Sequence, residues 1–128
     1  MSGVVSTDVG TRFLEALGRR DYETLGLCFA SDATLRAILP PGLREDDGRE
    51  AIVRRFRGWT EDIDEFEVLA ADAEPCADLL RIRWELGGLD PHFDGEGRSV
   101  FEQMAYAEVE GDSIAAMRLA CTGRRAAP

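Results

Sequence analysis

Regular alternation in the segment DLLRIRWEL is the feature that most constrains the fold of this chain. Apolar and charged residues alternate along the segment: Leu80, Ile82, Trp84 and Leu86 with Arg81, Arg83 and Glu85 between them. A repeat of two residues predicts a β-strand with one face on a hydrophobic core and the other in water. Such strands are typical of antiparallel sheets, in which one face can remain solvated.

Other segments predict further strands of the same sheet. Residues 33–39, ATLRAIL, form the first, and EFEVLAA predicts another in which Phe66, Val68 and Ala70 alternate and so share one face. A long strand is expected over residues 98–109, and IAAMRLACT returns beside it after the turn EGDS. The acidic stretch REDDG, which follows two prolines and a glycine, is expected to be a solvated loop.

Three helices are expected, and they precede most of the strands. Apolar residues recur at helical spacing on their inner faces: Val9, Phe13 and Leu17, then Tyr22, Leu25 and Phe29, then Ile52, Phe56 and Trp59. Asp21 is expected to cap the second helix, and Asp47 and Glu50 have capping-box spacing before the third. Helices followed by strands indicate the α+β class, and 128 residues suit a single domain over residues 1–128.

The composition excludes several classes of function. The net charge is -10, which argues against binding to nucleic acid or to an anionic membrane. All 15 basic residues are arginine, so no lysine can form a Schiff base or anchor pyridoxal phosphate. His92 is the single histidine, which excludes a zinc site built on several histidines, and no nucleotide-binding motif is present. We therefore expect neither a metal nor another cofactor.

The expected location is the cytoplasm. The N-terminal residues MSGVVSTDVG lack the basic start and apolar stretch of a signal peptide. No apolar run approaches the roughly 20 residues that span a bilayer. The three cysteines, Cys28, Cys76 and Cys121, are widely spaced and are expected to be free thiols.

Five segments together resemble one known family. These are RRDYETLGLCFASDATL, GREAIVRRF, RWELGG, FDGEGRSV and VEGDSIAAMRL, which are similar to segments of the nuclear transport factor 2-like superfamily and its SnoaL-like, or polyketide cyclase-like, branch. The resemblance implies a cone-shaped α+β fold, with three N-terminal helices packed on a bent, mostly antiparallel sheet and an apolar pocket at its open end. It also implies a homodimer formed through the outer sheet face, where Val100, Met104 and Tyr106 are expected.

The preference for arginine over lysine favours a bacterial source.

The pocket implied by the resemblance would bind a small, largely uncharged and apolar molecule. Its expected lining comes from both the helices and the strands: Phe13, Leu17, Leu35, Ala37, Phe56, Trp59, Gln103 and Met117. On this interpretation the protein is a binder whose exact function the sequence does not define.

The alternative is an enzyme of secondary metabolism. In ketosteroid isomerases, relatives of the same superfamily, the reactive side chains fall at positions that are apolar here: Phe13, Ala37 and Met104 or Ala105. Polyketide cyclases of the SnoaL-like branch place a histidine before the GR-x-V strand and an acid on it, which makes His92 and Glu102 candidates. Epoxide hydrolases use an arginine and two carboxylates, for which Arg83, Glu85 and Glu102 are candidates. Whether the protein is an enzyme stays open at this stage.

The phase of the strand near residue 100 decides between these interpretations. One face carries Gln103 and the other carries Glu102 with a second glutamate, Glu108. Burying an unpaired carboxylate costs far more free energy than burying an amide that finds partners. We therefore expect Gln103 to point into the pocket, where it would orient a carbonyl or hydroxyl group of the ligand.

Overall fold

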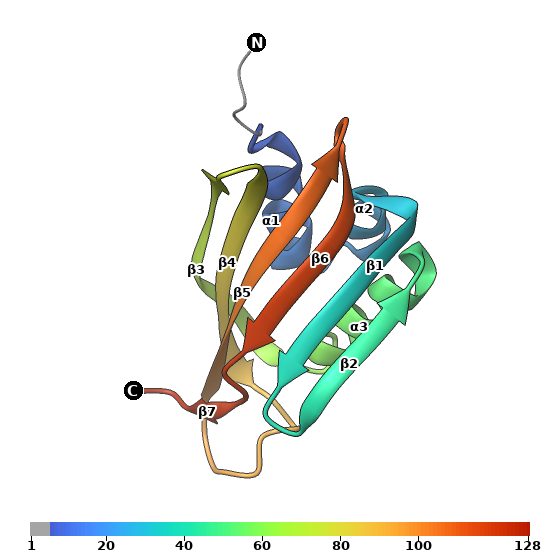
Figure 1. Cartoon of the computed structure of the whole chain (residues 1–128). Helices are drawn as coiled ribbons and strands as arrows, with labels where there is room; N and C mark the ends of the chain where they lie inside the picture. The colour runs from blue at the N-terminus through green and yellow to red at the C-terminus, as the bar shows by residue number, and fades with distance from the viewer. Residues whose placement is uncertain (1–5) are drawn as a thin grey trace.

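Three helices pack against one face of a strongly curved sheet (Figure 1). The computed structural model describes residues 6–128. Its helices are α1 (Asp8–Arg19), α2 (Tyr22–Leu27) and α3 (Arg49–Thr60). Its strands are β1 (Phe29–Leu39), β2 (Gly42–Asp47), β3 (Asp64–Cys76), β4 (Leu79–Leu89), β5 (Ser99–Glu110), β6 (Ser113–Cys121) and β7 (Arg125–Ala126). Within residues 6–128 no helix is both long and apolar enough to cross a membrane.

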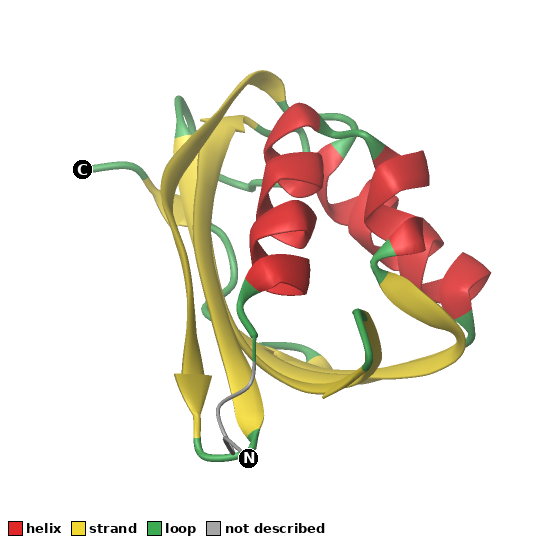
Figure 2. Cartoon of the chain, turned by 90° about the horizontal axis from the view of Figure 1, so that it is seen from above, coloured by secondary structure: helices red, strands yellow, loops and turns green. Residues whose placement is uncertain are grey.

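The strands lie in the order β2-β1-β6-β5-β4-β3, and the short β7 pairs with β5. Neighbouring strands are antiparallel except β1 and β6, which run parallel. Seen from above, the sheet bends around the helices, which cover its concave side (Figure 2). The predicted α+β fold, with helices on a bent and mostly antiparallel sheet, is therefore confirmed.

Side chains from helices and strands meet in one hydrophobic core. The inner face of β4 is fully buried as its alternation predicted: Leu80, Ile82, Trp84 and Leu86. Phe13 of α1 lies against two more aromatic rings, with its centroid 5.8 Å from that of Phe29 and 5.4 Å from that of Phe56, both edge to face. Pairs in this geometry stabilise a fold by about 0.5–1.5 kcal/mol beyond the area they bury.

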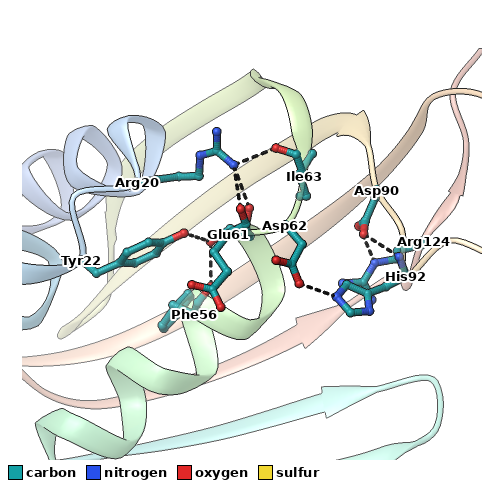
Figure 3. Close-up of polar contacts among 10 residues, drawn as sticks. Arg20, Tyr22, Phe56, Glu61, Asp62, Ile63, Asp90, His92 and Arg124 are labelled. Carbon is teal, nitrogen blue, oxygen red and sulfur yellow. Dashed lines mark hydrogen bonds and ion pairs between the residues drawn. The ribbon is translucent and has the colours of Figure 1, made fainter.

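Arg20 links the first two helices to the end of the third. It follows α1 in a left-handed conformation, and its Nη1 donates to the carbonyl oxygens of Thr60 at 3.1 Å and Ile63 at 2.8 Å (Figure 3). The last carbonyls of a helix have no hydrogen-bond partner within the helix. A guanidinium at that end donates to them, and its positive charge interacts favourably with the helix dipole. The hydroxyl of Tyr22 also lies 2.6 Å from that of Thr60. These contacts hold the turn between α3 and β3.

The acidic stretch REDDG is not the solvated loop that the sequence predicted. Most of it belongs to β2, which pairs with β1 from Leu39↔Gly42 to Thr34↔Asp47. Arg36 of β1 forms ion pairs with Glu45 at 2.9 Å and Asp47 at 3.0 Å, and these connect the edge strand β2 to β1. An edge strand needs only one partner, and charged side chains there discourage pairing with other chains.

Two expected details at helix ends also differ. Asp47 does not cap α3, because it lies in β2 and its carboxylate binds Arg36; the cap residue is Gly48, with φ 90° and no side-chain hydrogen bond. Phe29 is not on α2, which ends at Leu27, but begins β1 and is still fully buried. Asp21 does cap α2, since its side chain accepts from the backbone N–H of Thr24 at 3.2 Å.

Two apolar residues of the sheet differ from expectation. Ala70 does not share a face with Val68: Val68 lies opposite the inward Leu86 and near Gly18 of α1, whereas Ala70 lies opposite the outward Glu85, because the pairing of β3 with β4 is irregular between them. Val100 has the outward phase of Glu102 but is buried, at the point where β5 also pairs with β7. Met104 and Tyr106 remain on the outer face, where Tyr106 is exposed.

Candidate functional site

A hollow of about 810 Å³ lies at the end of the sheet where three connecting segments meet. These are the β1–β2 turn, the β4–β5 loop and the segment that follows β6, all at the same end of the molecule in Figure 1. We call it the hollow. Its walls are Leu39, Pro40, Pro41, Trp59, His92, Phe93, Asp94, Gly95, Phe101, Gln103, Cys121, Thr122, Gly123 and Arg124.

Gln103 is the most deeply placed polar group of these walls. It is 1% exposed and lies between Trp84 of β4 and Cys121 of β6 in the register of the sheet. The indole Nε1 of Trp84 donates to its Oε1 at 2.7 Å. This bond fixes which end of the amide is the oxygen, and the amide nitrogen has no protein partner within residues 6–128. The wall therefore offers a fixed N–H donor to whatever occupies the hollow.

Asp90 organises the rim of the hollow. Its side chain is 2% exposed, and its Oδ2 accepts a hydrogen bond from Nε of Arg124 at 2.6 Å (Figure 3). Its Oδ1 accepts from the backbone N–H of His92 at 2.9 Å. A buried carboxylate is stable only when it is paired and hydrogen-bonded, so this one holds the β4–β5 loop against the segment after β6. The Arg124 guanidinium also lies 5.7 Å from the ring centroid of Phe101.

His92 stands at the mouth of the hollow. Its Nε2 lies 3.3 Å from Oδ2 of Asp62, which is in the turn held by Arg20 (Figure 3). Both side chains are about half exposed, so water screens their interaction. The pair nevertheless brings an imidazole and a carboxylate together, which is the arrangement that orients a histidine for proton transfer.

Comparison with known proteins identifies the family. The sequence profile of the SnoaL-like domain matches residues 11–117. The chain belongs to the SnoaL-like domain family. None of the curated proteins with which the sequence was compared matches it.

Solved structures share the SnoaL-like fold at low sequence identity. One is a Catenulispora acidiphila protein with a ketosteroid isomerase-like fold in complex with trimethylamine, 21% identical, with a TM-score of 0.69 over 90% of this chain and 85% of that one. Another is a candidate polyketide cyclase from Xanthomonas campestris, 15% identical, with a TM-score of 0.68 over 89% and 87%. A third, from Sinorhizobium meliloti and also a candidate polyketide cyclase, is 18% identical, with a TM-score of 0.65 over 88% and 93%.

The hollow of this SnoaL-like chain contains two of the eight residues expected to bind a ligand. Trp59 and Gln103 line it. The other six belong to the closed core, where each is at most 1% exposed: Phe13, Leu17, Leu35, Ala37, Phe56 and Met117. The helices press directly onto the sheet there, so the open space lies further toward the end of the strands.

The candidate catalytic residues are not brought together. His92 lines the hollow, whereas Glu102 lies on the opposite face of β5 from Gln103 and is paired there with Arg83. The hydrogen bond from Arg83 to Glu102 raises the pKa of the guanidinium above its ordinary value. Glu85 lies 3.5 Å from Arg125, outside the hollow as well. The strand phase predicted from the cost of burying a carboxylate is confirmed, because Gln103 is inward and Glu102 outward.

Several residues of this SnoaL-like site were not predicted. Asp90 and Arg124 form its charged rim, Phe101 and Cys121 line its wall, and Asp62 contacts His92. The alternation of Met117, Leu119 and Cys121 does indicate that Cys121 faces inward. Among residues 6–128, no group of three or more His, Cys, Asp or Glu side chains is placed to hold a metal ion.

Proposed function

We propose that this SnoaL-like protein binds a small, largely apolar and uncharged molecule in the hollow, with a carbonyl or hydroxyl oxygen directed at Gln103. The observation that carries the proposal is the buried amide of Gln103, whose oxygen is held by Trp84 and whose nitrogen has no protein partner in the described chain. The nitrogen opens on the hollow, where an acceptor atom of a ligand would replace water in a hydrogen bond worth about 0.5–1.5 kcal/mol.

The size and lining of the hollow support an apolar ligand. Binding sites for small molecules usually enclose about 300–1,000 Å³ and combine apolar walls with a few placed polar groups. The hollow measures about 810 Å³, and its walls include the aromatic residues Trp59, Phe93 and Phe101 beside Leu39 and two prolines. Gln103 then fixes the orientation of a molecule that the apolar walls retain.

The charges at the rim support an uncharged ligand. Arg124 is the one arginine among the residues that line the hollow, and its charge is already matched by Asp90 at 2.6 Å. An anion would therefore meet a neutral ion pair instead of a free cation, and Asp94 would repel it. A neutral acceptor can still take a hydrogen bond from the guanidinium without separating the pair.

The test measures binding of benzylacetone, a small aryl ketone, by the fluorescence of Trp59 and Trp84. Gln103→Leu is expected to weaken binding about tenfold, because one buried hydrogen bond to the ligand is lost. The matched control is Glu102→Gln, the adjacent residue on the other face, which should leave the Kd unchanged. Circular dichroism verifies that each variant is folded, and Trp59→Leu changes the wall from a different element. Unaltered affinity in both hollow variants would contradict the proposal.

A second candidate function is acid–base catalysis of the polyketide cyclase type. The observation in its favour is His92, which lines the hollow and lies 3.3 Å from the Asp62 carboxylate. Two structural neighbours are candidate polyketide cyclases, although they share only the fold with this chain. His92→Gln should abolish turnover of a cyclisable polyketone while leaving its binding intact. The epoxide hydrolase set gains no support, since Arg83, Glu85 and Glu102 lie outside the hollow.

A homodimer in the bacterial cytoplasm is the remaining part of the proposal. Four apolar residues follow one another across the outer face in the register of the sheet: Leu43, Ile38, Ala120 and Met104. Ile38 is 62% exposed and Leu43 is 54% exposed. Exposed apolar groups in a continuous row favour burial against a partner surface, and a second copy offers the same row.

A further inference from the structure

Cys121 lies next to Gln103 in the wall of the hollow. The two residues are directly opposite each other on the neighbouring strands β6 and β5, and both line the hollow. Opposite residues of an antiparallel pair have their Cβ atoms about 4.5–5.5 Å apart. The sulfur of Cys121 accepts a hydrogen bond from the backbone N–H of Gly123 at 3.4 Å and is half-buried.

The other two cysteines have no such surroundings. Cys28 is buried in the core, where loss of solvent raises the pKa of its thiol above the ordinary value. Cys76 is exposed at the end of β3, away from the hollow. Only Cys121, of these three, therefore combines access to the hollow with a neighbouring side chain that can donate a hydrogen bond.

The amide of Gln103 supplies a hydrogen-bond donor beside Cys121. It is almost fully buried, its nitrogen has no protein partner in residues 6–128, and Trp84 prevents the amide from presenting its oxygen instead. A sulfur nucleophile beside a fixed N–H donor suits an electrophile with two matching parts. One is a carbon that the sulfur can attack, and the other is an oxygen, conjugated to that carbon, that accepts the hydrogen bond. Such compounds are α,β-unsaturated ketones and aldehydes.

We propose that Cys121 is a covalent attachment site for α,β-unsaturated carbonyl compounds bound in the hollow, a step that rests on the proposed binding function. The thiol loses its proton to water, and the thiolate sulfur forms a bond to the β-carbon of the ligand. The π electrons of the C=C bond move to the carbonyl oxygen, where the N–H of Gln103 stabilises the enolate. The enolate then takes a proton from water at its α-carbon. The net change is addition of S–H across C=C, with no oxidant or reductant.

The experiment uses the full chain carrying Cys76→Ser, which removes the exposed thiol. The probes are benzylideneacetone, an aryl enone, and benzylacetone, its saturated counterpart. Intact-mass measurement and peptide mapping follow the adduct over time at increasing enone concentration. We expect one adduct, on Cys121, at a rate that saturates with enone concentration and is slowed by benzylacetone.

Two variants separate the roles of the neighbouring residues. Cys121→Ser should form no adduct, while its circular dichroism should match that of the parent chain. Gln103→Leu should lower the limiting rate about tenfold, through loss of one hydrogen bond to the enolate. Competition by benzylacetone needs neither variant, so the proposal remains testable if Gln103→Leu fails to fold.

The outcomes distinguish this inference from the proposed function. Binding of benzylacetone without any enone adduct on Cys121 overturns the covalent site and leaves the binding function standing. A rate that rises linearly with enone concentration and ignores benzylacetone also overturns it, since the thiol would then react as it does in solution. If benzylacetone does not bind and the adduct rate does not saturate, both proposals are overturned.

Discussion

Asp90 and Arg124 form an ion pair that closes the rim of the hollow, with Oδ2 of the buried carboxylate 2.6 Å from Nε of the guanidinium. The two residues are 34 positions apart, one just after β4 and the other just after β6. The same carboxylate accepts from the backbone of His92, so one side chain positions two of the three segments that surround the hollow.

Arg124→Met should be strongly destabilising for this reason. The methionine keeps much of the side-chain length but leaves the Asp90 carboxylate buried without a cation, which costs about 3–5 kcal/mol. The measurement is the free energy of unfolding in urea. Arg118→Met is the control, because Arg118 pairs with Glu108 on the exposed outer surface and its loss should change stability by less than about 1 kcal/mol. Equal effects in the two variants would show that the rim pair does not organise the hollow.

Gly123→Ala should disturb the hollow through the β1–β2 turn. Gly123 has φ 78°, and a Cβ there would lie 2.6 Å from Cγ of Pro40. Gly97→Ala is the matched control, since Gly97 has the same φ of 78° and nothing within 4 Å of the added carbon. The control should lose only about 1–2 kcal/mol of stability, from the backbone strain of an alanine at positive φ. Gly123→Ala should lose more stability than this and should also weaken ketone binding. Thermal unfolding and fluorescence titration measure the two effects, and identical behaviour of both variants would refute the predicted clash.

Asp21→Ala should lower the melting temperature in a pH-dependent manner. Hydrogen bonds from the side chain and the backbone N–H of Thr24 hold the pKa of Asp21 below the ordinary value of an aspartate. The cap is therefore fully effective above the unfolded pKa, and its contribution is lost as the pH falls through the lower folded pKa. The difference in melting temperature between wild type and variant should be constant near neutral pH and shrink in strongly acidic buffer. Glu23→Ala provides the comparison, and a gap that persists at the lowest pH would contradict the assignment.

Ile38→Asp should separate the proposed dimer into monomers. The substitution puts a charge in the middle of the apolar row on the outer face, next to Leu43 and Ala120. Leu27→Asp is the control, because Leu27 is 59% exposed on the helical side, away from that row. Sedimentation velocity at micromolar concentration reports the mass of each species. A wild-type chain that sediments only as a 14.1 kDa monomer would remove the dimer from the proposal.

The sequence predicted those parts of the fold that local periodicity determines. Alternation around Trp84 placed β4 and its buried face correctly, and the cost of burying a carboxylate placed Gln103 inward and Glu102 outward. Residues 42–47 were missed as a strand because an edge strand rich in charge has no apolar face to reveal it. Its backbone pairs with β1 and its carboxylates contact Arg36 of that strand, and no local pattern indicates either contact.

The hollow was harder to predict than the fold. An apolar residue such as Phe13 or Met117 has the same sequence signature in a packed core as in a pocket wall. Whether two layers close on each other depends on the distance between them, which periodicity does not contain. Asp90 and Arg124 illustrate the same difficulty for charged residues, because their contact depends on how two loops meet in space.

The parallel pairing of β1 with β6 has a consequence for how the protein folds during synthesis. Leu35 pairs beside Met117, so the interior of the sheet joins the early and the late parts of the chain. The antiparallel strands β3 to β6 can pair with their neighbours as they emerge, whereas β1 and β2 must wait for β6 before they join them. Contacts between such distant segments slow folding, because a long loop closes before they form. The concave wall is therefore completed only when β6 is available, and until then the aromatic core around Phe13 lacks part of its cover.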